Sequence, residues 1–216
     1  RLLTELVNTL ADSPLKRVLL NATADYHTLL SLGGRGIQTA NQFGVQVNTI
    51  NNAADVPALT AALRDALRLL ETVTTNLSKA GRRERTLTNK ISKLERTAAE
   101  ATSTATSTAK AATSAEVNVA SQLGTSSENV MRQLVETMST KIDELLVVLR
   151  GKEGGIKAIA DPENAKVVHK WYHTAWKYTK GFGWFGAIVG AGWAAFKILA
   201  PIALLGGAAY WLFGGD

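Results

Sequence analysis

The sequence predicts an all-α protein in which long heptad-patterned helices, forming a coiled coil or helical bundle, are followed by a C-terminal transmembrane helix. Apolar residues recur at steps of three and four through most of residues 57–149, the repeat of helices packed side by side. Residues 182–213 form 32 positions with one charge, Lys197, which is long enough for one membrane span. Hydrophobic residues make up 46% of the chain but aromatic residues only 6%, which argues against a large globular core.

The first 56 residues divide into a helical part and a loop. Residues 1–32 carry two short amphipathic helices, separated at Asp12-Ser13-Pro14, where proline suits the start of the second helix. Residues 33–56 are predicted as an irregular loop, because the glycines at 33, 34 and 36 are expected to end that helix. No Gly-Lys-Ser/Thr follows these glycines, so a phosphate-binding loop is not favoured.

Residues 57–149 are predicted as a long helical stalk. Only Glu84 and Thr108 interrupt the first apolar stripe over about nine heptads. The register then changes, and a break is expected near Gly124, so that the segment is either one interrupted rod or two helices folded back. A lone helix would expose its stripe, which favours a homo-oligomer. Its predicted core consists of Leu59, Leu63, Leu70, Val73, Leu77, Leu87, Ile91, Leu94, Ile142, Leu145 and Leu149.

Residues 99–121 are the weakest part of this stalk. Alanine, threonine and serine replace the leucines there, and small side chains bury less apolar area. The stretch is interpreted either as a place for rearrangement or as a plain helical spacer. Further upstream, the basic run Gly81–Arg85 allows a helix break, a basic contact, a protease-accessible site or a solvated helical face.

A linker is predicted over residues 150–165, with Asp161-Pro162-Glu163 starting the last helix before the membrane. Residues 166–181 are predicted as an aromatic and basic juxtamembrane helix, because tryptophan, tyrosine and lysine alternate there. A core aromatic cluster is the competing interpretation. Together with aromatics of the next segment, the expected interface residues are Lys170, Trp171, Tyr172, Trp176, Lys177, Tyr178, Lys180, Trp184, Trp193, Tyr210 and Trp211.

Residues 182–213 are predicted as the membrane segment. A span from Trp193 to Trp211 places its two end rings about 27 Å apart, which matches the two interfacial belts. An alternative span begins near Phe182 and bends at Pro201. Residues 150–180 carry seven Lys and Arg residues, so the positive-inside tendency places the stalk on the cytoplasmic or virion-interior side of a single-pass anchor.

No catalytic constellation is recognisable, so the sequence does not indicate an enzyme, a cofactor or a metal site. His169 and His173 share one helical face, but no third ligand lies near them in the sequence. Because both border the membrane segment, they are candidate pH sensors whose protonation near pH 6 would strengthen membrane contact. The chain has no cysteine, which excludes disulfides and thiolate ligands.

These features predict a membrane-anchored, oligomeric protein that acts on lipid bilayers. The order of heptads, aromatic helix and span over residues 57–213 is similar to the membrane-proximal half of helical viral fusion subunits. That similarity is architectural and identifies no family. It implies a viral or phage structural protein for membrane penetration, fusion or genome delivery, in a virion or host-cell membrane. The alternatives are a passive coiled-coil tether that binds a protein partner through residues 1–56 and, since the net charge is +6, a membrane-bound nucleic-acid contact.

Overall fold

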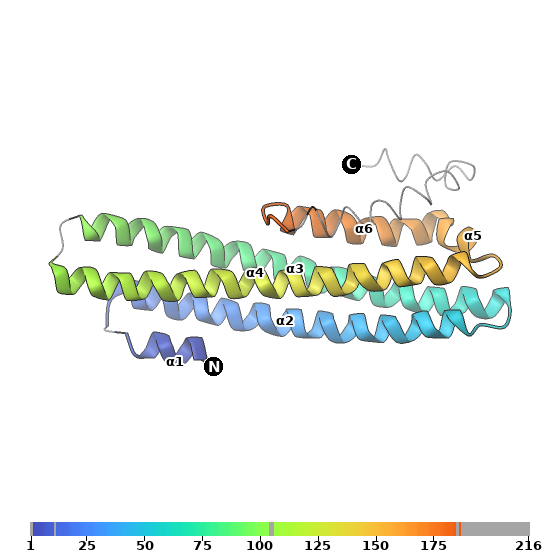
Figure 1. Ribbon diagram of the computed structural model, residues 1–216, viewed down its shortest axis with the longest axis horizontal. Coiled ribbons are helices and arrows are strands. Elements are labelled where there is room, and N and C mark those ends of the chain that lie inside the picture. Colours follow the sequence, from blue (N-terminus) through green and yellow to red (C-terminus); the bar gives the residue numbers. More distant parts are fainter. Residues whose placement is uncertain (1, 11, 104–105, 185, 187–216) are drawn as a thin grey trace. The chain divides into compact units, whose positions relative to one another are not determined.

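The computed structural model describes residues 2–10, 12–103, 106–184 and 186, and these residues form an all-helical structure (Figure 1). The all-α prediction is therefore confirmed for the part of the chain that is described. The helices are α1 (Leu2–Asn8), α2 (Pro14–Asn51), α3 (Val56–Thr102), α4 (Ser107–Arg150), α5 (Gly155–Ala160) and α6 (Pro162–Thr179).

The chain folds into two compact units, and the three long helices contribute a segment to each. Unit 1 contains the described parts of residues 1–33 and 79–131, and unit 2 contains those of residues 34–78 and 132–216. Unit 1 thus combines α1 with the first part of α2, the last part of α3 and the first part of α4. Unit 2 combines the remaining parts of these three helices with α5 and α6.

Unit 1 shows that α3 and α4 fold back on each other. A methyl group added at Gly124 of α4 would lie 3.7 Å from Cδ1 of Ile91 of α3, so residues 33 apart in sequence are neighbours. The chain reverses between Thr102 and Ser107, whereas Gly124 lies inside α4. The break predicted near Gly124 is therefore wrong. The core of this unit is formed by Val7, Leu19, Ala22, Leu87, Ile91, Leu94, Val119, Ala120 and Leu123.

The alanine-rich stretch is where the chain turns. Ala101, Ala111 and Ala112, which continue the small-residue pattern, are exposed on the helix ends that flank the connection. Alanine gains little from burial compared with leucine, so the chain loses little apolar contact by reversing there. The nine-heptad continuous stripe predicted from the sequence is therefore interrupted at its weakest point.

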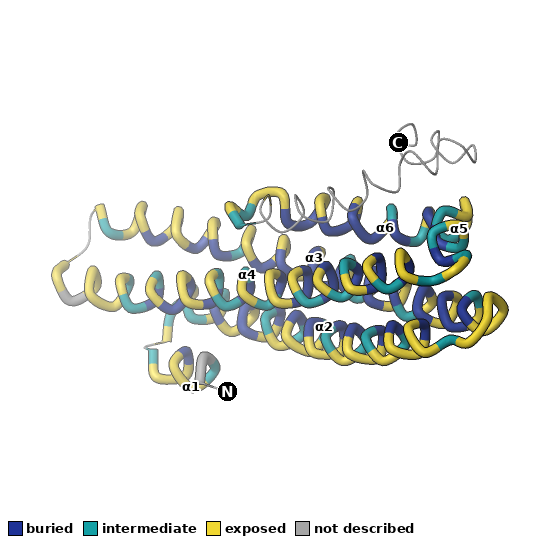
Figure 2. Tube along the Cα trace, turned by 45° about the vertical axis from the view of Figure 1, so that its right-hand side comes forward, coloured by how far each residue is buried: buried dark blue, intermediate teal, exposed yellow. Residues whose placement is uncertain are grey.

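The heptad stripes are covered within a single chain. Figure 2 shows buried positions along the inward-facing sides of α3 and α4. The residues predicted as an oligomer core are all buried, with exposed fractions of 8% for Ile91 and 2% or less for the others. Their partners come from neighbouring segments of the same chain, so the stripes give no reason to expect a second chain.

The predicted loop over residues 33–56 is helical as far as Asn51, because α2 continues through its glycines. Gly33 and Gly36 lie against α4: a methyl group at Gly33 would approach Cγ1 of Val130 to 2.5 Å, and one at Gly36 would approach Cδ1 of Leu134 to 2.6 Å. Each of these glycines therefore lets α2 approach α4 closely within its own unit. Gly33 and Gly36 serve helix packing, not helix termination.

Alanine substitutions at two neighbouring glycines should have opposite effects. Gly36→Ala inserts a methyl group against the fully buried Leu134, and such overpacking costs about 1–3 kcal/mol. Gly34→Ala meets nothing within 4 Å and should raise the free energy of unfolding by about 0.5–1 kcal/mol through its helix propensity. Chemical denaturation of both variants measures the difference. Equal stabilisation by both would show that α2 does not approach α4 at Gly36.

The basic run Gly81–Arg85 lies inside α3 and takes part in polar contacts of unit 1. Arg83 Nη1 lies 3.5 Å from Asp25 Oδ1, and Lys90 Nζ contacts the other carboxylate oxygen of Asp25. Glu84, which interrupts the apolar stripe, is buried and accepts a hydrogen bond from Thr88 Oγ1 at 2.7 Å. Its pKa is raised, chiefly because burial removes water from the carboxylate. The helix-break interpretation of this run is wrong.

Candidate membrane-contacting surface

Helix α6 is the last described helix before the apolar segment, and its start is fixed by a side-chain cap. Asp161 Oδ1 accepts a hydrogen bond from the backbone N–H of Glu163 at 3.1 Å, and Pro162 occupies the first turn. Proline lacks only an N–H that the first turn leaves unpaired in any case. The helix therefore begins at the Asp161-Pro162-Glu163 signal, four residues earlier than the predicted bound of 166.

One face of α6 packs into unit 2 and includes three of the aromatic residues. Trp171 is fully buried, Tyr172 is 3% exposed and Tyr178 is 9% exposed. Ser78 Oγ of α3 lies 3.5 Å from the hydroxyl of Tyr178, and the charge of Asp143 of α4 acts on Tyr172. The prediction of a membrane interface is therefore wrong for Trp171, Tyr172 and Tyr178, which form the core cluster that was the competing interpretation.

Where this face of α6 packs into unit 2, some buried polar atoms lack hydrogen bonds to the described residues. Trp171 Nε1 of α6 and Asp143 Oδ1 of α4 are buried and make no hydrogen bond to any described residue. Burial raises the pKa of Asp143, and burial together with the charge of Asp143 raises the pKa of Tyr172. A buried polar group without a hydrogen bond costs about 1–3 kcal/mol. The apolar and aromatic packing of this face must therefore outweigh that cost.

The opposite face of α6 is basic. Lys166, Lys170, His173, Lys177 and Lys180 are all exposed, and their spacing of three and four residues places them in one row; we call this row the basic stripe. Trp176 lies beside it with 53% of its surface exposed. The predicted interface residues on this face, Lys170, Trp176, Lys177 and Lys180, are thus accessible. Their amines and indole can bind an anionic, partly apolar surface.

The two candidate pH sensors lie at the edge of this face. The rings of His169 and His173 are stacked with centroids 6.4 Å apart; His169 is half-buried and His173 is exposed. Burial, and then the charge of His173, lower the pKa of His169, so His169 gains its charge at a lower pH than an ordinary histidine. Within the described residues, no group of three or more His, Cys, Asp or Glu side chains is placed to hold a metal ion.

Acidification is expected to destabilise the fold through His169. Because its pKa is lower in the folded chain than the unfolded value of about 6.5, the unfolded chain binds the proton more readily. The contribution of neutral His169 is therefore fully present above about pH 6.5 and is lost as the pH falls towards the folded pKa. His169→Gln should weaken the decline in unfolding free energy between about pH 7 and about pH 5. An unchanged decline in the variant would contradict this assignment.

The remaining predicted interface residues lie at or beyond the end of the described chain. Trp184 is half-buried and stacks on Phe182, with ring centroids 5.4 Å apart. Trp193, Tyr210, Trp211 and most of the predicted span over residues 182–213 lie outside the described residues. None of the described helices has the length and apolarity that crossing a bilayer requires.

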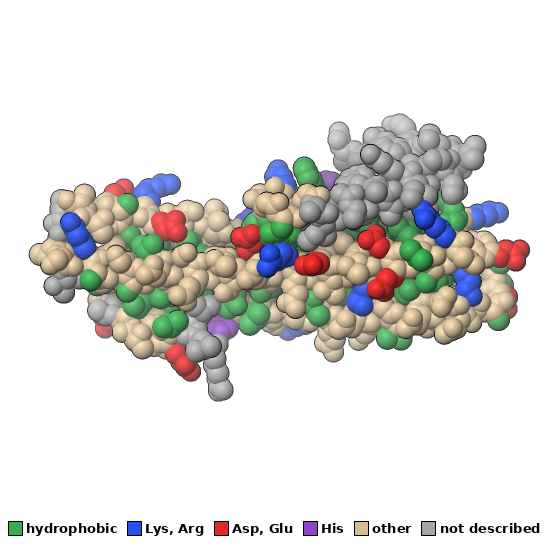
Figure 3. Space-filling model, in the orientation of Figure 1, with side chains coloured by type: hydrophobic (Ala, Val, Ile, Leu, Met, Phe, Trp, Pro, Cys, Tyr) green, Lys and Arg blue, Asp and Glu red, His purple; other side chains and the backbone are tan. Residues whose placement is uncertain are grey.

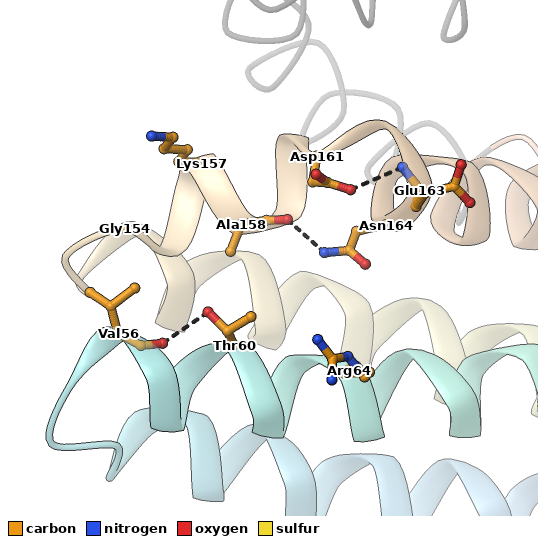
Figure 4. Close-up of a pocket in the computed structure, with 9 residues that line it drawn as sticks. All are labelled: Val56, Thr60, Arg64, Gly154, Lys157, Ala158, Asp161, Glu163 and Asn164. Atoms are coloured by element: carbon orange, nitrogen blue, oxygen red, sulfur yellow. Dashed lines mark hydrogen bonds between the residues drawn. The ribbon is translucent and has the colours of Figure 1, made fainter.

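Sequence reasoning missed a hollow in unit 2, which Figure 4 shows between α3 and the connection to α6. It has a volume of about 520 Å³ and is lined by Val56, Thr60, Arg64, Gly154, Lys157, Ala158, Asp161, Glu163 and Asn164. Asn164 Nδ2 donates to the carbonyl oxygen of Ala158 at 2.8 Å, and Asp161 caps α6. These polar groups hold helix ends together, and the lining carries charges of both signs. Its residues come from separate helices, so no local sequence signal could have revealed it.

Charges elsewhere on the visible surface are mixed. On the face drawn in Figure 3, Lys and Arg side chains are interspersed with Asp and Glu side chains. A nucleic-acid interface would instead gather basic side chains along the path of the phosphates, so this face offers no support for one. Comparisons with protein-family models, curated proteins and solved structures found no match to this chain.

Proposed function

We propose that this protein is a helical bundle attached to a lipid bilayer by the apolar segment 182–213. The observation that carries the proposal is the run of 32 residues with Lys197 as the sole charge, since a bilayer core requires roughly 20 apolar residues. The segment begins three residues after α6 ends at Thr179. The bundle would then lie on the lysine-rich side of the membrane, as the positive-inside tendency favours.

Of the two roles that such an anchored bundle can have, the tether is the better supported. The heptad stripes are covered within one chain, which removes the argument for an oligomeric stalk that drives membranes together. A bundle whose apolar stripes are buried within one chain is suited to hold a partner at the membrane. The first helices are candidates for that contact, because Leu20, Leu30 and Val45 of α2 are exposed, with Val45 at 62%.

One observation favours the second role, an action on membranes in penetration, fusion or genome delivery. The face of α6 that packs into unit 2 carries Trp171 and Tyr172 and covers buried polar atoms that lack hydrogen bonds to the described residues, among them Trp171 Nε1. Such a face costs less to release than a fully satisfied one. Once released, its aromatic rings would be suited to the membrane interface.

Dye release and lipid mixing separate the two roles. The full chain is added to vesicles at neutral and mildly acidic pH, beside a variant that ends at Lys180. A tether gives stable vesicle association of the full chain without release or mixing. Release or mixing that disappears in the shortened variant would refute the tether and establish action on the membrane.

A further inference from the structure

The basic stripe of α6 has the geometry of a surface for anionic lipid headgroups, and we propose that it binds them. This inference rests on the proposed anchoring by residues 182–213 and adds which face of the bundle meets the membrane. From Lys166 to Lys180 the stripe rises about 21 Å along the helix. All five side chains can reach one plane only when α6 lies along that plane, so the helix is expected to lie flat on the membrane surface.

The chemistry of the stripe matches this occupant. Four lysines and His173 are exposed on the outer face. Glu163, at the start of the helix, is also exposed and carries a negative charge. Each lysine near an anionic surface gains electrostatic attraction, while its methylene stem can lie along apolar material. The positive stripe is therefore complementary to phosphatidylserine or a similar anionic headgroup.

Two further features select lipid over nucleic acid. Trp176 lies beside the stripe with 53% of its surface exposed, and an indole is suited to the headgroup level of a bilayer, where one edge is apolar and the N–H stays wet. The apolar segment follows Lys180 by one residue, so insertion of that segment brings the stripe to the membrane surface. Duplex nucleic acid would use the lysines but neither of these two features.

The opposite face of α6 stays with the bundle in this arrangement. Trp171, Tyr172 and Tyr178 remain buried, because headgroup contact requires only the outer side chains. The sequence-based prediction assigned all the aromatic residues of this helix to the membrane interface. In the proposed arrangement, only the outer face with the basic stripe and Trp176 contacts the membrane.

Vesicle binding of charge variants of the full chain tests the inference. The stripe variant carries Lys166→Gln, Lys170→Gln, Lys177→Gln and Lys180→Gln. The matched control carries Lys79→Gln, Lys93→Gln, Lys110→Gln and Lys157→Gln, which removes the same charge from exposed sites on α3, α4 and α5. Binding is measured to vesicles of phosphatidylcholine alone and of phosphatidylcholine mixed with phosphatidylserine.

We expect the unmodified chain and the control to bind the phosphatidylserine vesicles more tightly than the neutral ones. The stripe variant should lose this preference by on the order of 600-fold, because each of the four lysines near an anionic surface contributes about fivefold. All three proteins should bind the neutral vesicles alike through residues 182–213. Equal loss in the stripe variant and the control would overturn the inference, because the effect would then follow net charge alone.

The result also separates this inference from the proposed anchoring. Binding to neutral vesicles without a phosphatidylserine preference refutes the stripe and leaves the anchor intact, whereas no binding to either vesicle refutes the anchor. Duplex DNA is the competing ligand in the same buffer. DNA binding tighter than vesicle binding, lost in the stripe variant alone, would assign the stripe to nucleic acid instead of lipid.

A dye attached at the stripe reports its position directly. The chain has no native cysteine, so Lys170→Cys provides a single labelling site for an environment-sensitive fluorophore. Its emission should shift to the blue on phosphatidylserine vesicles, and that of a matched label at Lys79→Cys should not. A shift at Lys79 alone would place a different face on the membrane.

Discussion

Replacing Trp171 with alanine should lower the free energy of unfolding by about 3–5 kcal/mol. The indole is fully buried between α6 and the rest of unit 2, and its removal leaves a large cavity beneath the helix. The variant should also expose α6, because aromatic packing holds that helix in place. Chemical denaturation followed by circular dichroism measures the first effect, and amide hydrogen exchange of residues 162–179 measures the second.

Trp176→Ala is the matched control, because it removes the same side chain from the exposed face of the same helix. With 53% of its surface exposed, Trp176 packs less than the fully buried Trp171, and its loss should lower the free energy of unfolding by only about 1 kcal/mol. If the two variants were equally stable, Trp171 would not be a core residue. A membrane-interface role for it would then regain support.

Asp25→Ala is expected to cost about 2 kcal/mol of unfolding free energy in unit 1. The Asp25 side chain is 11% exposed and lies between two cations, Arg83 at 3.5 Å and Lys90 in direct contact. Removing the carboxylate leaves those cations close together without the opposing charge. The partners are partly solvated, with 51% and 36% of their side-chain surfaces exposed, and this keeps the cost below that of a fully buried pair.

An exposed pair elsewhere in the chain provides the comparison. Asp65 lies 3.6 Å from Arg68, and both side chains are more than half exposed. Asp65→Ala should therefore change the free energy of unfolding by about 0–0.5 kcal/mol. Chemical denaturation of both variants decides the matter: a cost for Asp25→Ala no larger than that for Asp65→Ala would mean that α2 and α3 are not joined by these charges.

Much of the fold could be predicted because its signals are local. Heptad spacing identified residues such as Leu63 and Leu145 as core positions, and both are fully buried. Pro14 begins α2 and Asp161-Pro162 begins α6, since capping and proline geometry act within one turn. These features depend only on residues that are close together in the chain, so they can be recognised from the sequence alone.

The errors concern contacts between distant segments. Gly33 and Gly36 resemble a helix stop, and only the approach of Val130 and Leu134 shows that they make room for α4. Apolar spacing likewise does not say whether a stripe faces a second chain or another part of its own chain. Leu87 and Leu123 belong to one core, although they come from helices that the sequence allowed to be a single rod.

The candidate site was predicted in composition but not in orientation. The sequence identified α6 as aromatic and basic, and both properties suit a membrane surface. They suit equally a helix that buries Trp171 and displays Lys170, because tryptophan stabilises a core as well as an interface. The face of a helix that turns inward depends on the segments it meets, here α3 and α4.

Vesicle flotation of the full chain and of a variant ending at Lys180 tests the central claim most directly. The shortened variant retains every described helix, so circular dichroism should show that it is still folded. Anchoring by residues 182–213 predicts that the full chain floats with neutral vesicles and resists alkaline extraction, while the folded variant stays in the soluble fraction. A full chain that fails to float, or a shortened variant that floats equally well, would contradict the anchor.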